Sequence, residues 1–145
     1  MKKLIVYQGI QGSGKSTEAK AFVMEDPDNR VRVNRDDIRL MLGKPFNPKI
    51  ENLVTDIEKA ALEAAMKQEK TVVSDNMNMN PKVIKFLEDL AKRFGYEVEY
   101  HFIYTPLEVC IERDSKRLNP VGEDVIRKTY KVYENFIEKY NPEKC

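Results

Sequence analysis

Short apolar runs and helical stripes alternate along this 145-residue chain. The apolar runs predict strands at residues 3–8, 31–33, 71–74 and 96–104. Apolar residues spaced three and four positions apart predict helices at residues 15–25, 35–42, 49–69, 81–94, 106–118 and 123–140. Because strands and helices follow one another in turn, the order predicts an α/β fold with a parallel sheet covered by helices on both faces.

Two of the predicted helices carry long apolar stripes. The helix at 49–69, which follows a proline-punctuated loop at 44–48, is expected to turn one set of residues to the core: Ile50, Leu53, Val54, Ile57, Ala61, Ala64 and Ala65. The helix at 123–140 is expected to run unbroken, with an inner stripe of Ile126, Tyr130, Tyr133, Ile137 and Tyr140. Both stripes predict helices that pack along their whole length.

A glycine-rich stretch separates the first strand from the first helix. It reads Gly9, four residues, then Gly14-Lys15-Ser16, which is the G-x-x-x-x-G-K-[ST] pattern of phosphate-binding loops. Glycines let backbone N–H groups converge on an anion, the lysine adds positive charge, and the serine hydroxyl can bind Mg²⁺. The context predicts a site for the phosphates of ATP or another NTP, formed by Gly9, Gly12, Ser13, Gly14, Lys15, Ser16 and Thr17.

Two more polar segments, residues 34–39 and 75–80, follow predicted strands. Ligands of such sheets bind beyond the carboxyl ends of the strands, so both segments should face the phosphate-binding loop across one cleft. Asp36 and Asp37 are candidates to accept the proton of an acceptor hydroxyl, or they stabilise a helix N-terminus. Arg39, one turn later, either holds a substrate phosphate or is an ordinary solvated arginine.

Asp75 and two arginines extend this predicted site. Asp75 could contact the ligands that surround Mg²⁺, without binding the metal directly. It could instead orient Arg39 or Asp36, or cap the segment that follows it. Arg113 and Arg117 are four residues apart on a predicted helix that leads into a lid at about 113–123, so they should lie one above the other and face a ligand. The alternative is that the two arginines pair with acidic neighbours on the same helix.

Composition narrows the possible functions. Charged residues make up 34% of the chain but the net charge is +1, so any bound polyanion must be held by a local basic patch. The length predicts one domain over residues 1–145. Two cysteines without metal spacing, and no apolar run long enough for a membrane span, predict a cytoplasmic protein that is not bound to a membrane. The Asn-Lys-x-Asp motif of GTPases is absent.

Several motifs together resemble a known family, the phage-type 5′-hydroxyl polynucleotide kinases, as found in the kinase half of the T-even phage polynucleotide kinase/phosphatase. The similar motifs occur in the same order over nearly the whole chain. Beyond the phosphate-binding loop they are Asn34-Arg35-Asp36-Asp37-Ile38-Arg39, Val73-Ser74-Asp75, Asn78-x-Asn80-Pro81, Gly95-Tyr96-x-Val98-Glu99, Arg113-x-Ser115-Lys116-Arg117 and Asp124-Val125-Ile126-Arg127.

The resemblance implies a three-layer P-loop kinase fold with four or five parallel strands, and ATP-dependent, Mg²⁺-dependent phosphorylation of 5′-OH ends of DNA or RNA. Asp36 would be the general base, and Arg39 would hold the acceptor's neighbouring phosphate, with Asp75 and Asn78 also on the acceptor side. Lys15, Ser16 and Arg113 would serve the donor phosphates and Mg²⁺, and Arg117 the transferring phosphate.

The chain departs from the family pattern in two places. The segment from Asp75 to Pro81 is one residue longer, which leaves the roles of Asn76 and Asn78 open. The sequence to Cys145 has no Asp-x-Asp-x-Thr phosphatase motif, so we expect no 3′-phosphate removal by this chain and leave room for a separate phosphatase or ligase as partner.

Two other functions stay open at this point. One is a kinase of small metabolites with the same fold, with a sugar, nucleoside or antibiotic as acceptor. Its acceptor would need a closed pocket, whereas a polynucleotide needs an open groove with a phosphate contact. The other is an ATP-gated binding module, which would bind ATP without phosphorylating any acceptor.

Overall fold

A computed structural model describes residues 2–43 and 47–144, so most of the predicted loop at 44–48, and Cys145, lie outside the described residues. The strands are β1 (Lys3–Gln8), β2 (Arg30–Val33), β3 (Thr71–Asp75) and β4 (Glu97–Phe102). The helices are α1 (Lys15–Met24), α2 (Arg35–Met41), α3 (Glu51–Lys67), α4 (Pro81–Phe94), α5 (Leu107–Ser115), α6 (Glu123–Val132) and α7 (Glu134–Glu138), with 3-10 turns η1 (Pro48–Ile50) and η2 (Pro142–Lys144).

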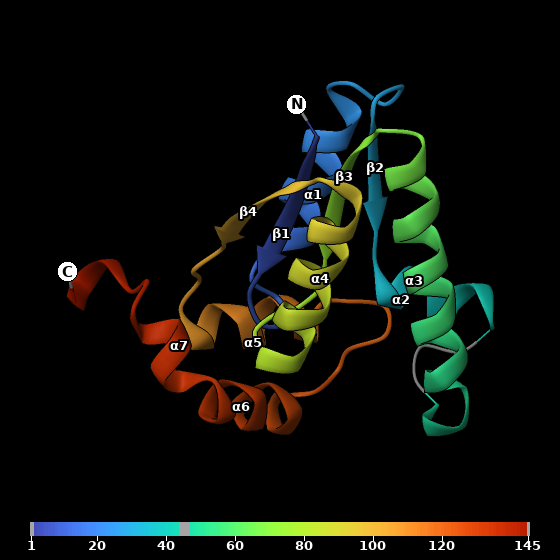
Figure 1. The fold of residues 1–145 in the computed structure, drawn as a ribbon. Coiled ribbons are helices and arrows are strands. Elements are labelled where there is room, and N and C mark those ends of the chain that lie inside the picture. Colours follow the sequence, from blue (N-terminus) through green and yellow to red (C-terminus); the bar gives the residue numbers. More distant parts are fainter. Residues whose placement is uncertain (1, 44–46, 145) are drawn as a thin grey trace.

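The four strands form one parallel sheet in the order β2-β3-β1-β4, which confirms the predicted α/β fold (Figure 1). In the register of this sheet, Tyr7 of β1 lies beside Asp75 of β3, and Gln8 lies beside Phe102 of β4. The carboxyl ends of β1, β3 and β4 are therefore level. The loops that leave these strands meet at one edge, where a ligand site is expected.

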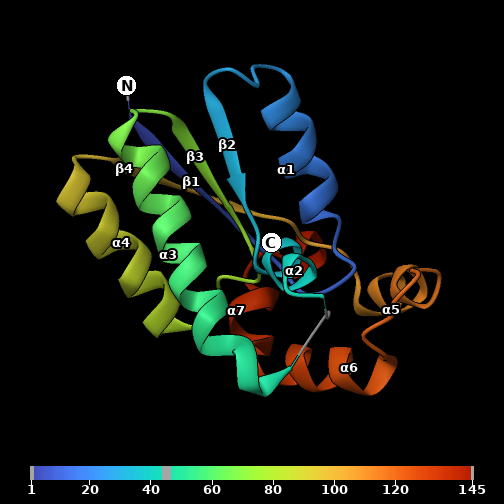
Figure 2. The ribbon, with the colours of Figure 1, turned by 90° about the vertical axis from the view of Figure 1, so that its right-hand side faces the viewer.

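Side chains of β1 alternate between the two faces of the sheet. Leu4 and Val6 join the core under α3 and α4, while Ile5 and Tyr7 pack with Ala19 of α1. Figure 2 shows the resulting layers, with α3 and α4 on one side of the sheet and α1 on the other. Because both faces are covered, the central strands β1 and β3 are buried along almost their whole length, as is typical of a parallel sheet, whereas the edge strands β2 and β4 carry charged residues.

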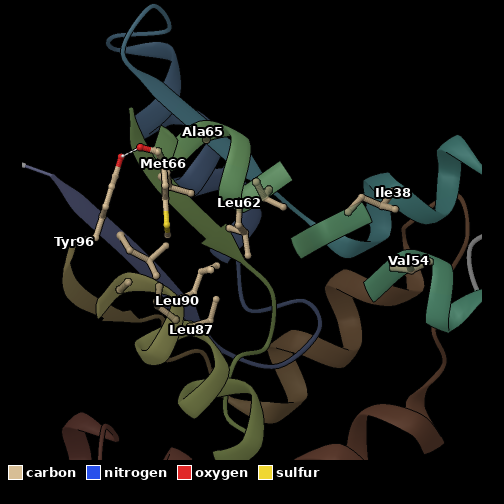
Figure 3. Close-up of a cluster of buried hydrophobic side chains, with 13 residues drawn as sticks. Ile38, Val54, Leu62, Ala65, Met66, Leu87, Leu90 and Tyr96 are labelled. Carbon is tan, nitrogen blue, oxygen red and sulfur yellow. Dashed lines mark hydrogen bonds between the residues drawn. The ribbon is translucent and has the colours of Figure 1, made fainter. Parts of the chain in front are cut away.

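The core between the sheet and α3 and α4 is closely interlocked. Leu62 and Met66 of α3 meet Leu87 and Leu90 of α4, as Figure 3 shows. The hydroxyl of Tyr96 donates to the Met66 carbonyl at 3.3 Å and to the Lys70 carbonyl at 2.7 Å, so its polar end is satisfied at the rim. This cluster fixes α3 against the sheet, and α3 in turn carries acidic residues toward the site.

The expected stripe of the 49–69 helix is partly wrong. Its first turn is η1, Leu53 is 48% exposed and Ala64 is exposed, whereas Leu62 and Met66 are buried. The buried face starts at Val54 and continues through residues three or four positions apart. It includes an acidic residue, Glu58, as well as Leu62, Ala65 and Met66. The prediction included Val54 and Ala65 of this face but left out Leu62 and Met66.

Two expectations near the C-terminus are also corrected. The 123–140 helix is broken at Tyr133 into α6 and α7, and the bend lets Ile126 and Ile137 enter one cluster with Cys110 under the phosphate-binding loop. The helix that starts after Pro106 ends at Ser115, so Arg117 lies in the loop that follows. The predicted stacking of Arg113 and Arg117 on one helix is therefore wrong.

The corrected face of α3 can be tested with two leucines of the same helix. We expect Leu62→Ala to lower the free energy of unfolding by about 2–5 kcal/mol, because Leu62 is 0% exposed and truncation leaves a cavity. Leu53→Ala should change it by about 0.5 kcal/mol or less, because the side chain is half exposed. Urea denaturation measures both, and an equal loss in the two variants would contradict the packing described.

Candidate active site

The phosphate-binding loop joins β1 to α1 at the level edge of the sheet. Gly9 N–H donates to the Met77 carbonyl at 3.2 Å, and Ser13 N–H donates to the Ile10 carbonyl at 3.2 Å. The N-terminus of α1 follows Gly14, which supplies no side-chain cap. The first N–H groups of a helix lack intrahelical partners, so this end can bind an anion.

Three contacts from the β4–α5 segment support the loop from outside. The Thr105 hydroxyl donates to the Ser13 carbonyl at 2.7 Å, and the Arg113 guanidinium donates to the same carbonyl at 3.3 Å. Gly12 packs directly on the backbone of Cys110. Burial raises the pKa of the Cys110 thiol to about 11, so this thiol is neutral and serves packing. Thr105 was not predicted, because only the fold brings it to the loop.

Four buried side-chain oxygens lack a hydrogen-bond partner within the described residues, and all four lie at the carboxyl ends of β1 and β3. They are Gln11 Oε1, Ser13 Oγ, Asp75 Oδ1 and Asn78 Oδ1. Buried polar atoms are rarely left unpaired, and a ligand is one explanation when they cluster. The phosphate-binding loop is therefore the candidate site on structural grounds as well as on its motif.

Lys15 turns its ammonium group back toward the loop. Its Nζ donates to the Ile10 carbonyl at 3.2 Å. Burial lowers the pKa of Lys15, and the negative charges of Asp75 and Asp36 partly offset that effect. Both carboxylates therefore lie within electrostatic range of Lys15, although they come from β3 and α2. The Asn34 side-chain amide donates to the Asp75 carbonyl at 2.6 Å, which confirms that the two segments meet at this edge of the sheet.

Asp36 is an exposed acid at the edge of the site, as is its neighbour Asp37. Asn34 caps α2, accepting the Asp37 N–H at 2.8 Å, so Asp36 lies in the first helical turn with its side chain 66% exposed. Arg39 Nη1 donates to Asp36 Oδ1 at 2.7 Å. The arrangement presents an accessible carboxylate beside a guanidinium.

Arg39 is held on its other side by Glu51 of α3. Glu51 accepts from Arg39 Nε at 2.9 Å and from Arg39 Nη2 at 2.7 Å, in a two-pronged contact that fixes the guanidinium plane. The hydrogen bond from Arg39 lowers the pKa of Glu51, so this carboxylate stays ionised. Arg39 is thus no freely solvated side chain. Glu51 was not predicted, and its partner could not be read from sequence spacing.

Arg35 makes a second connection between α2 and α3. Its guanidinium donates to Glu58 at 2.6 Å and to Glu51 at 3.3 Å. Glu58 also accepts from Asn76 Nδ2 at 3.2 Å, and the backbone N–H of Arg35 donates to Asn76 Oδ1 at 2.9 Å. Asn76, in the lengthened segment after β3, therefore ties α2 and α3 to the sheet edge.

Asp75 is placed differently from the prediction. Its side chain is 0% exposed and its Oδ2 accepts from Arg32 Nε at 2.7 Å, rather than contacting Arg39 or Asp36. Arg32 also pairs with Asp37. A buried carboxylate cannot contact an acceptor directly. The expected contact of Asp75 with the acceptor is therefore corrected: Asp75 pairs with Arg32 inside the protein.

Asn78 is also buried and serves the backbone. It has a positive φ of 51°, which Asn tolerates better than most residues, and it is 4% exposed. Its Nδ2 donates to the Tyr7 carbonyl at 2.9 Å and to the Ser74 carbonyl at 3.2 Å, joining β1 to β3. The structure corrects its expected acceptor contact to this bridging role.

Arg117, which was predicted to lie on a lid, pairs with an acid at the end of α5. Arg117 is 47% exposed and lies 3.7 Å from Asp114, whose carboxylate accepts the N–H groups of Val121 and Gly122 at 2.9 Å each. Asp114 is therefore the residue that shapes the loop at 116–122. Arg117 remains able to turn toward a ligand because it is half exposed.

The described part of the chain lacks two other kinds of feature. Within residues 2–43 and 47–144, no helix is long and apolar enough to cross a bilayer. The same residues contain no group of three or more His, Cys, Asp or Glu that could hold a metal. The Ser16 hydroxyl stays the predicted protein ligand of a Mg²⁺ ion bound with the phosphates of a nucleotide.

Gly12 and Gly95 form a matched pair for testing the loop. We expect Gly12→Ala to weaken ATP binding by about tenfold or more, because the added methyl group would lie 2.4 Å from the Cys110 carbonyl oxygen and must displace the loop. Gly95→Ala has a similar positive φ but meets no atom within 4 Å, so it should cost about 1 kcal/mol of stability and leave ATP affinity unchanged. Isothermal titration calorimetry measures the affinities, and equal ATP affinities in the two variants would contradict this account.

Comparisons with known proteins agree with this geometry. A putative bifunctional polynucleotide kinase/RNA ligase of Autographa californica nuclear polyhedrosis virus is 30% identical over 161 residues, which cover 97% of this chain and 22% of the viral protein. A chain in the structure of the Pnkp1/Rnl/Hen1 RNA repair complex superposes with a TM-score of 0.80 and 29% identity, over 96% of this chain and 46% of that one. The chain therefore spans less than half the length of either.

More distant structures share the fold. The Mycobacterium tuberculosis APS kinase CysC, solved in complex with AMPPNP and APS, superposes with a TM-score of 0.60 at 18% identity, covering 79% of this chain and 69% of its own. The family described as AAA domain matches residues 4–141. Because that match takes in nearly the whole chain, and because the loop and sheet have the corresponding form, the protein belongs to the AAA domain family and has the P-loop kinase fold.

Proposed function

We propose that this chain transfers the γ-phosphate of ATP to the 5′-hydroxyl of DNA or RNA. The observation that carries the proposal is the exposed carboxylate of Asp36, which lies beside Arg39 and within electrostatic range of Lys15. A base, an anion contact and a phosphate-binding lysine are the parts that phosphoryl transfer to an alcohol needs. The names of the viral relative and of the RNA repair complex support nucleic acid as the acceptor.

The donor site would be formed by the loop and the residues around it. The loop's N–H groups other than those of Gly9 and Ser13, which already donate to carbonyls of the protein, would hold the phosphates together with the first turn of α1, Lys15 and Arg113. The buried Ser13 hydroxyl would find a partner there. The Ser16 hydroxyl would hold Mg²⁺ together with those phosphates. The metal would neutralise charge on the phosphates as the bond to the leaving ADP breaks.

On the acceptor side, Asp36 would take the proton as the 5′-oxygen attacks the γ-phosphorus. Arg39 would contact the acceptor's neighbouring phosphate, in an orientation fixed by Glu51. Arg117 would turn from the lid toward the transferring phosphate, adding positive charge where negative charge moves. The names of both relatives also suggest an RNA ligase as a functional partner, which would consume the 5′-phosphate formed.

A direct transfer assay tests the proposal. ATP labelled in the γ-phosphate is incubated with the protein, Mg²⁺ and single-stranded DNA or RNA bearing a 5′-OH, beside sugars, nucleosides and the same oligonucleotides bearing a 5′-phosphate. We expect the most label in the 5′-OH oligonucleotides, little in plain nucleosides, and none in sugars or in the oligonucleotides that already bear a 5′-phosphate. Preferential labelling of a sugar would establish a metabolite kinase instead, and ATP binding without any transfer would establish a binding module.

Replacement of Lys15 tests the donor site. We expect Lys15→Ala to fold normally and to lower kcat by about 10² or more, because the backbone N–H groups alone cannot follow the charge of the transferring phosphate. Circular dichroism and steady-state kinetics check the two statements. Near-normal turnover by a folded Lys15→Ala protein would overturn the assignment of the loop.

Asp36 and Asp37 provide a matched pair for the base. Asp36→Asn keeps the size of the side chain but cannot take a proton, so kcat should fall by about 10² while ATP and oligonucleotide affinities persist. Asp37→Asn should lower kcat by about tenfold at most, because the amide oxygen can still accept from Arg32. Equal losses of kcat in two equally stable variants would remove the base assignment.

A further inference from the structure

Arg32 joins two carboxylates that come from different elements. It lies on β2 with its side chain 13% exposed. Its Nε donates to Asp75 Oδ2 at 2.7 Å, and its Nη1 donates to Asp37 Oδ2. One guanidinium therefore ties the buried end of β3 to the first turn of α2, and neither contact is used by the proposed chemistry.

Asp75 needs such a partner because its carboxylate is removed from water. Its exposed fraction is 0%, and its second oxygen, Oδ1, has no hydrogen-bond partner within the described residues. A buried carboxylate without a cation is costly, so it attracts any cation within reach. Two cations lie in this region. Arg32 is in contact with Asp75, and Lys15 reaches the Ile10 carbonyl in the loop that leaves β1, the strand whose Tyr7 lies beside Asp75.

We propose that Arg32 is a positioning residue of the donor site: by holding Asp75 it prevents that carboxylate from capturing the Lys15 ammonium, and so leaves Lys15 available to the donor phosphates. Within the described residues Lys15 Nζ donates to a neutral acceptor, the Ile10 carbonyl, which a phosphate can displace. Arginine suits this task because its planar fork can hold two carboxylates at once, which one ammonium does less well. The inference rests on the proposed function only in taking ATP as the donor.

The inference predicts a specific loss of ATP affinity. Arg32→Gln should weaken ATP binding by about tenfold, because Lys15 would be drawn to the uncompensated Asp75. Arg30→Gln is the matched control, since Arg30 lies on the same strand and pairs with Glu25 and the Phe22 carbonyl, away from the loop. Its ATP affinity should match the wild type. Isothermal titration calorimetry with ATP and Mg²⁺, without any acceptor, measures all the variants.

A second pair of variants separates this role from a merely structural one. If Arg32 acts by neutralising Asp75, then Arg32→Gln combined with Asp75→Asn should bind ATP as well as Asp75→Asn alone, within about threefold. Arg32→Lys, which keeps a cation beside Asp75, should restore most of the affinity. The double variant removes both buried charges, so it can fold and be measured even where Arg32→Gln cannot.

Two results would overturn the inference. One is wild-type ATP affinity in folded Arg32→Gln, and the other is a double variant that binds ATP about tenfold more weakly than Asp75→Asn, since independent losses add. Failure of the proposed function would be seen in a different experiment, the transfer of phosphate to oligonucleotides. The coupling between Arg32 and Asp75 is measured by ATP binding without an acceptor, so its result does not depend on that transfer.

Discussion

A chain of arginine–carboxylate pairs holds α2 in place, and the geometry of the candidate site depends on it. The helix has seven residues and only Ile38 is buried, too little for packing alone to fix a helix this short. Arg32 ties it to β3 through Asp75, while Arg35 and Arg39 tie it to α3 through Glu58 and Glu51. Asp36 is carried on this helix, so its position opposite the loop follows from these pairs.

The donor side of the cleft is held by different forces. The phosphate-binding loop leaves a strand buried on both faces and is supported by the backbone of the β4–α5 segment, including the Cys110 carbonyl under Gly12. Backbone contacts leave little freedom, which suits a cradle whose N–H groups must converge on phosphate. The side that carries Asp36 is built instead from ion pairs between side chains of α2, α3, β2 and β3.

Local signals predicted the sheet and the phosphate-binding loop, because each depends on residues close in sequence. The relatives confirm the resemblance to polynucleotide kinases. The partners of buried polar groups could not be predicted, since Asp75 meets Arg32 only through the pairing of β2 with β3. Glu58 was hidden for the same reason: its buried position on α3 makes sense only once Arg35 lies opposite. The break at Tyr133 depends on where Ile126 and Ile137 must pack.

The central claim is that Asp36 and Arg39 together recognise a hydroxyl with a phosphate nearby. The most direct measurement compares kcat/KM for a nucleoside 3′-phosphate with kcat/KM for the plain nucleoside, in the wild type and in Arg39→Ala. The account predicts that the wild type prefers the 3′-phosphate by about tenfold or more, and that Arg39→Ala loses most of that preference. An unchanged preference in a folded Arg39→Ala protein, or equal rates for the two acceptors in the wild type, would contradict it.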